Sequence, residues 1–184
     1  MRQFLLLALV AGVLGGCGAQ PQPQPPAPAA SVAPVASVDP AFNPTDAAWL
    51  GLMIPMDEQF LKILAFAPAN SADPAVRRLA ANLTVSHQAE LKQLIALRDR
   101  AHLPTENAHF GHDMPGMMTE DEVAALQKLR GPAFDKVLRR EVKDHLDQSA
   151  LVTRSVKAAG QEAGVKQLAT TIEKTRAAQA AGLG

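Results

Sequence analysis

Residues 109–118 read HFGHDMPGMM and place two histidines and three methionines within one short stretch. The whole chain has only five histidines and six methionines, so both types are enriched here. Imidazole nitrogen suits copper, zinc and iron, and thioether sulfur favours Cu(I). One interpretation is an accessory soft-metal site made by His109, His112 and Met114. The other is a hydrophobic plug, in which Met117 and Met118 close the end of a core.

Three more ionisable side chains lie on rows of apolar residues spaced three or four apart, as on the buried face of a helix. They are Asp57, His87 and His145, and the thioether of Met56 precedes Asp57. A buried carboxylate is costly unless it is paired or binds a cation. The group therefore predicts either an interior metal site or an inert hydrogen-bonded Asp–His network, because buried polar groups need partners in both cases.

The elements that position these residues are predicted to be helices throughout. Aromatic residues make up 4% of the chain and tyrosine is absent, while alanine, leucine and charged helix-forming residues are abundant. Start and stop signals, such as the capping pair Thr119 and Glu122, divide the domain. The predicted helices run from Asp46 to about Phe66, from Pro74 to about Ala101, from Thr119 to Leu129, from Gly131 to Gly160 and from about Glu162 to Ala181.

An internal repeat relates the two halves of this domain. Met56 falls on His145 when the chain is shifted by 89 residues, since 145 − 56 = 89, and the same shift places Gln59 on Gln148 and Leu79 on Leu168. Each half is then an αα-hairpin with an apolar face, and two such hairpins bury those faces by packing together. The sequence predicts an all-α four-helix bundle made of two repeated hairpins, with a short extra helix in the connection.

The N-terminus predicts export and lipid attachment. Arg2 precedes an apolar run that ends in Leu14-Gly15-Gly16-Cys17, the layout of a lipoprotein signal peptide over residues 1–16. Cys17 is the only cysteine, which excludes an internal disulfide and makes it the predicted lipidation site. Residues 17–43 are rich in proline, alanine and glutamine and predict an extended tether. Residues 44–184 form the bundle domain, held on the membrane of the bacterial cell envelope.

Composition and motifs also argue against several functions. The 18 basic and 18 acidic residues balance, and no basic face suggests nucleic acid. The chain has no nucleophile–base pattern, no phosphate-binding glycine loop and no HExxH motif, and Glu141 precedes His145 by four residues rather than the three of di-iron bundles. The protein is therefore expected not to be an enzyme. Its protein partner is not indicated.

Several stretches resemble a known bacterial family, the domain of unknown function 305. They are MIPMDEQ at 53–59, SADPAVRRLAANL at 71–83, SHQAELKQL at 86–94, MPGMMTEDEVAALQKLRGPAFD at 114–135 and KDHLDQ at 143–148. The resemblance covers residues 44–181. It implies a secreted, ferritin-like bundle, and some members of the family are linked to copper.

The family pattern has a His-His pair in the first long helix and another in the third. Here the first pair reads Met56-Asp57, and the second keeps His145 and continues with Leu146. Loss of three family histidines favours a structural or partner-binding module with a decayed site. Gain of His87, His109 and His112 favours binding or buffering of a soft metal, copper first.

Overall fold

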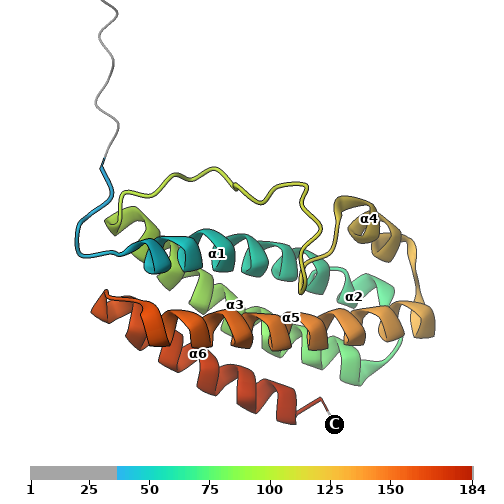
Figure 1. Ribbon diagram of the computed structural model, residues 1–184. Helices are drawn as coiled ribbons and strands as arrows, with labels where there is room; N and C mark the ends of the chain where they lie inside the picture. The colour runs from blue at the N-terminus through green and yellow to red at the C-terminus, as the bar shows by residue number, and fades with distance from the viewer. Residues whose placement is uncertain (1–36, 184) are drawn as a thin grey trace, which may run out of the picture. The chain divides into compact units, whose positions relative to one another are not determined.

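The computed structural model describes residues 37–183, and all regular secondary structure in that range is helical (Figure 1). The all-α prediction is confirmed. The predicted signal peptide, Cys17 and most of the predicted tether lie outside the described residues. The helices are α1 (Pro44–Leu64), α2 (Ala67–Asn70), α3 (Pro74–Arg100), α4 (Glu120–Lys128), α5 (Gly131–Ala159) and α6 (Ala163–Ala181).

The four long helices pack as two hairpins against each other. Helix α1 packs on α3, and α5 packs on α6, while α1–α5 and α3–α6 contacts join the hairpins. Figure 1 shows the four long helices side by side, with α4 beside the end of α1 and the start of α5. This is the arrangement that the sequence repeat predicts.

Local signals explain where the helices begin. Asn43 and Asp46 form a capping box at α1, and Thr119 and Glu122 form another at α4. The Asp73 side chain accepts from the backbone N–H of Ala75 at the start of α3. The four-residue helix α2 was not predicted. Pro68 lies in its first turn, where the missing N–H costs nothing, so this proline begins a helical turn instead of ending one.

Asp46 also joins the two hairpins. It is fully buried, and its carboxylate accepts hydrogen bonds from the backbone N–H groups of Gln161, at 3.1 Å, and Glu162, at 3.0 Å, in the turn between α5 and α6. Gly160 permits this approach, because a Cβ there would lie 2.5 Å from Asp46 Oδ1. The end of the proline-rich segment joins the same region, since Phe42 is buried in the core.

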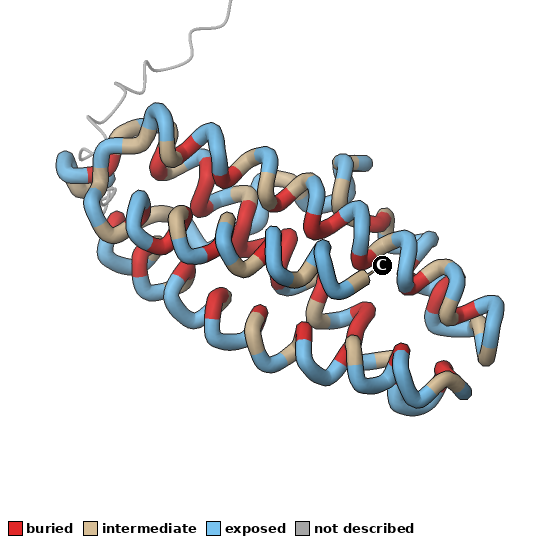
Figure 2. Tube along the Cα trace, turned by 90° about the horizontal axis from the view of Figure 1, so that it is seen from below, coloured by how far each residue is buried: buried red, intermediate tan, exposed pale blue. Residues whose placement is uncertain are grey.

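Two apolar clusters fill the bundle and are separated by a polar layer. Along α1, Met53 and Met56 belong to one cluster and Phe60 to the other. Six buried polar residues lie at or near the boundary of the two clusters, at least one on every long helix: Asp57 on α1, His87 and Glu90 on α3, His145 and Ser149 on α5, and Arg176 on α6. Figure 2 shows the buried positions along the inward faces of the helices.

None of the helices in residues 37–183 combines the length and apolar character that crossing a bilayer requires.

Candidate metal centre

The three side chains predicted to form an interior site come from three different helices. Asp57 of α1, His87 of α3 and His145 of α5 are 0–1% exposed. One ligand atom from each lies within 4.8 Å of the other two. The pattern of apolar rows thus predicted correctly that these side chains are buried, and the repeat indicated that Asp57 and His145 share one polar cluster. Met56 is also buried but belongs to one of the apolar clusters.

His87 is held in a defined tautomer. Its Nδ1 lies 2.9 Å from the carbonyl oxygen of Leu83, one turn earlier in α3, and this contact requires the proton on Nδ1. Nε2 therefore carries a lone pair, and it has no hydrogen-bond partner within residues 37–183. The ring is packed against Phe60, with centroids 4.6 Å apart. A fixed imidazole with a free inward lone pair is the arrangement that a metal ligand needs.

His145 is fixed by stacking rather than by hydrogen bonds. Its ring lies parallel to that of Phe60, with centroids 3.9 Å apart and an interplanar angle of 2°. Its Nε2 is 3.6 Å from Asp57 Oδ1, which is too long for a hydrogen bond. The inert Asp–His network that the sequence allowed is therefore not formed between these two side chains.

Arg176 is the part of the centre that sequence reasoning missed. It is 1% exposed, and its guanidinium donates to both carboxylate oxygens of Glu90, at 3.0 and 2.5 Å, and to Ser149 Oγ at 2.7 Å. Its Nη2 also lies 3.5 Å from Asp57 Oδ1. The signal was present in the repeat, because the shift of 89 residues places Arg176 on His87 and Gln179 on Glu90. The equivalent positions of the two hairpins thus hold an imidazole in one and a permanent cation in the other.

Burial determines the charge states of the centre. Desolvation raises the pKa of Asp57 well above its usual range, the Glu90 carboxylate adds to this shift, and Arg176 opposes it. Burial and then the charge of Arg176 lower the pKa of His87 to about 3. The same two causes hold the pKa of His145 well below its usual range. Both imidazoles are therefore neutral at physiological pH, as metal ligands must be.

Unpartnered donors converge in this layer. Within residues 37–183, six buried side-chain N and O atoms have no hydrogen-bond partner, and five of them belong to Asp57, His87 and His145. Native interiors leave few such groups, so their clustering at one point indicates a site for a ligand. Three ligands at about 2.1 Å from an ion, arranged in a plane around it, are about 3.6 Å apart, so donors that lie within 4.8 Å of one another would close by up to about 1.2 Å around an ion. The residues present fit a metal ion.

Residues 109–118, the His/Met loop, lie outside this centre. Met118 is buried in one apolar cluster and Met117 packs against the other, as predicted for a plug. The Gln59 side chain holds the loop to α1, since its amide donates to the Met118 carbonyl and its oxygen accepts from the Met118 N–H at 2.6 Å. Gly116, with φ +78°, packs so closely on α5 that a Cβ would lie 2.6 Å from the Gln148 side chain.

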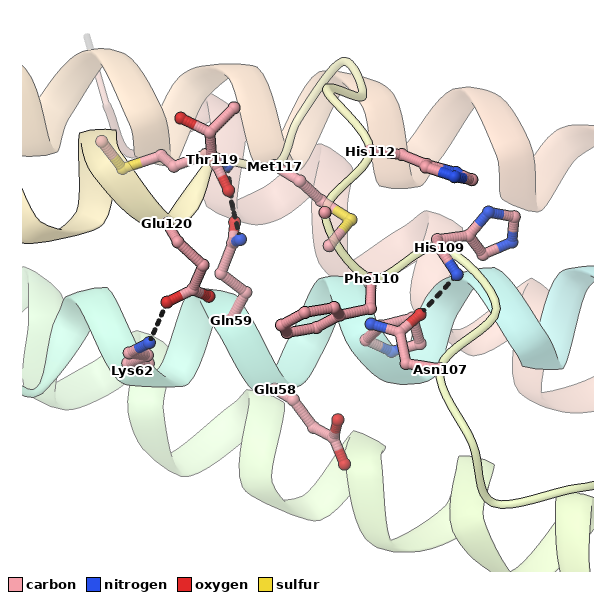
Figure 3. Close-up of a pocket in the computed structure, with 13 residues that line it drawn as sticks. Glu58, Gln59, Lys62, Asn107, His109, Phe110, His112, Met117, Thr119 and Glu120 are labelled. Atoms are coloured by element: carbon pink, nitrogen blue, oxygen red, sulfur yellow. Dashed lines mark hydrogen bonds and ion pairs between the residues drawn. The ribbon is translucent and has the colours of Figure 1, made fainter.

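The two loop histidines line an open hollow of about 200 Å³ together with Phe110 and Met117 (Figure 3). The rings of His109 and His112 meet edge to face, with centroids 6.2 Å apart. Met114 lines a different hollow, beside Glu122 and Asp144. Met117 lines both hollows, the one with His109 and His112 and the one with Met114. The grouping of His109, His112 and Met114 stays a prediction.

Comparison with known proteins shows the fold and the family. The model of the family described as Domain of unknown function (DUF305) matches residues 45–183. A DUF305 fragment from Deinococcus radiodurans is 22% identical, with a TM-score of 0.69 over 77% of this chain and 94% of that chain. A DUF305 protein from Streptomyces coelicolor, thought to be secreted, is 19% identical, with a TM-score of 0.65 over 76% and 89%. CopM in its Cu(II)-bound form is 19% identical, with a TM-score of 0.62 over 75% and 92%. No curated protein matches the sequence.

Proposed function

The chain belongs to the family of the domain of unknown function 305, and from this premise we propose that it binds or buffers a soft transition metal ion, copper above all, at the buried centre. We further propose that it does so outside the cytoplasm, as a lipoprotein anchored through Cys17. The observation that carries the metal proposal is the convergence of unpartnered donor atoms from Asp57, His87 and His145.

Similar structures support the choice of metal. CopM has been solved in Cu(II)-bound, Cu(I)-bound and Ag-bound forms, at 16–19% identity to this chain. At that identity the likeness shows the fold alone, so the metal is a proposal for this protein. The donor set agrees with it, because imidazole nitrogen is a good ligand for copper.

The residues of the centre would contribute in different ways to binding an ion. His87 and His145 would supply neutral nitrogen donors, and Asp57 would supply a carboxylate oxygen and one negative charge. Leu83 fixes the tautomer of His87 through its carbonyl group, and Phe60 fixes the ring plane of His145 by stacking. A bound copper ion would have its charge stabilised by these donors in a dry interior, which suits storage or buffering.

A second function is supported by Arg176. A buried guanidinium that already satisfies Glu90 and Ser149 can stabilise the polar layer without any metal. The bundle would then be a structural or partner-binding module. The free lone pair of His87 favours the metal, because His87 Nε2 has no hydrogen-bond partner within residues 37–183, and Asp57 meets Arg176 only as an ion pair at 3.5 Å.

A Cu(I) competition titration under reducing conditions tests the proposal. The H87A and H145A variants should each lose more than about 100-fold in affinity, since even outer-shell changes at metal sites cost 10–100-fold. The control is H102N, which changes an exposed histidine whose φ of 55° asparagine accepts readily. Equal affinities in wild type, H87A and H145A would refute binding at this centre.

A further inference from the structure

The buried centre contains one permanent positive charge among its acidic groups. Asp57, Glu90 and Arg176 are at most 6% exposed, so water does little to screen them. Arg176 is bound to Glu90 through both carboxylate oxygens and lies 3.5 Å from Asp57 Oδ1. Glu90 and Arg176 cancel each other, so Asp57, when ionised, supplies the one negative charge that can balance a bound ion.

We propose that Arg176 makes this centre selective for monovalent soft cations, Cu(I) or Ag(I), over divalent ones. The inference rests on the proposed function, because it concerns the charge of the ion that the same centre accepts. With a monovalent ion bound to ionised Asp57, the centre has zero net charge. With a divalent ion it retains one uncompensated positive charge in a desolvated interior, which is strongly unfavourable.

The position of Arg176 makes the effect direct. An ion bound to Asp57 would lie roughly 5 Å from the guanidinium. Relative to the same centre without that charge, each unit of ion charge lowers the affinity roughly 200-fold at an effective dielectric constant of about 20. A divalent ion bears this cost twice. The ratio of divalent to monovalent affinity is therefore set by the charge at residue 176, whereas losses of packing or geometry affect both ions.

The guanidinium is also held firmly. Ser149 Oγ accepts from Nε, and Gln179 Oε1 lies 3.3 Å from Nη1. The Gln179 amide in turn donates to Ser86 Oγ at 2.9 Å, next to His87. The cation therefore cannot swing away to make room for a second unit of charge. By the repeat, the same position in the first hairpin is the neutral ligand His87, so one half of the layer supplies a donor and the other a fixed charge.

The test compares the affinities for Ag⁺ and Zn²⁺, two ions that do not change redox state, in charge-matched variants. Arg176→Gln leaves the centre able to offer two carboxylates, and its Zn²⁺/Ag⁺ affinity ratio should rise by roughly 100-fold. Arg176→Lys keeps the charge but loses the two-pronged contact, and should keep a ratio close to that of wild type. The double variant Glu90→Gln/Arg176→Gln removes the ion pair at constant net charge. Its Zn²⁺/Ag⁺ affinity ratio should be much nearer to that of wild type than to that of Arg176→Gln.

Circular dichroism verifies folding of each variant before titration. Where Arg176→Gln does not fold, Glu90→Gln takes its place, because it removes one negative charge beside an intact guanidinium. The Zn²⁺/Ag⁺ affinity ratio of Glu90→Gln should fall by about tenfold or more relative to wild type. Ratios that are equal across Arg176→Gln, Arg176→Lys and Glu90→Gln, with both ions still bound, would overturn the role of Arg176 and leave the metal site standing. Failure of wild type to bind either ion would overturn the metal site and this inference together.

Discussion

Replacing Arg176 by methionine removes the cation that pairs with Glu90 while keeping a long side chain in the core. The two side chains are 1% and 7% exposed, so the pair is not of the surface type that contributes only 0–1 kcal/mol. Removing one partner of a buried pair typically costs about 3–5 kcal/mol. Burial raises the pKa of Glu90, so this carboxylate can take up a proton once the guanidinium is gone, and we expect a loss near the lower limit, about 3 kcal/mol.

The matched control is the double variant Glu90→Met/Arg176→Met. Replacement of a buried ion pair by apolar residues of similar volume is often neutral or stabilising, so its free energy of unfolding should lie within about 1 kcal/mol of wild type or above it. Urea denaturation of the metal-free protein at pH 7, followed by far-UV circular dichroism, measures all three proteins. A single variant that loses less than about 1 kcal/mol, or a double variant that loses as much as the single, would refute the energetic account of the polar layer.

Burial lowers the pKa of His87 to about 3, so the folded state keeps this ring neutral while the unfolded chain takes up a proton below pH 6.5, and stability is lost as the pH falls. Relative to wild type, H87Q should gain about 1.6 kcal/mol in total between pH 6.5 and 5, measured by urea unfolding. Replacing both His109 and His112 by alanine should change stability by less than about 0.5 kcal/mol and leave the highest Cu(I) affinity unchanged in a competition titration; a large loss of affinity would move the site to the loop. The Cys17→Ser variant should leave the membrane fraction or remain unprocessed, and unchanged partitioning would count against the anchor.

The fold could be predicted from the sequence because local and global signals agree. Caps at Asp73 and Thr119, apolar rows and a repeat without gaps all indicate the same helices. The short helix α2 was missed because Pro68 is compatible both with the end of one helix and with the first turn of another.

The candidate site could be predicted only in part. Helical periodicity places Asp57, His87 and His145 on inward faces, but it does not give distances between helices, so the absence of an Asp57–His145 hydrogen bond was visible only in the structure. Arg176 was overlooked because arginine is usually exposed, and its burial depends on Glu90, 86 residues away along the chain. Periodicity also does not describe the turn at Gly116, next to which Met114 lines a hollow beside Glu122 and Asp144.

The central claim is that Asp57, His87 and His145 hold a metal ion between the two hairpins. Anomalous diffraction from crystals of the protein loaded with one equivalent of Ag⁺ tests it most directly, because it locates the ion without assuming its ligands. We expect one strong anomalous peak inside the bundle, roughly 2 Å from His87 Nε2 and His145 Nε2 and beside the Asp57 carboxylate, as metal–nitrogen bonds require. A peak only at His109 and His112, or no peak between the helices, would contradict it.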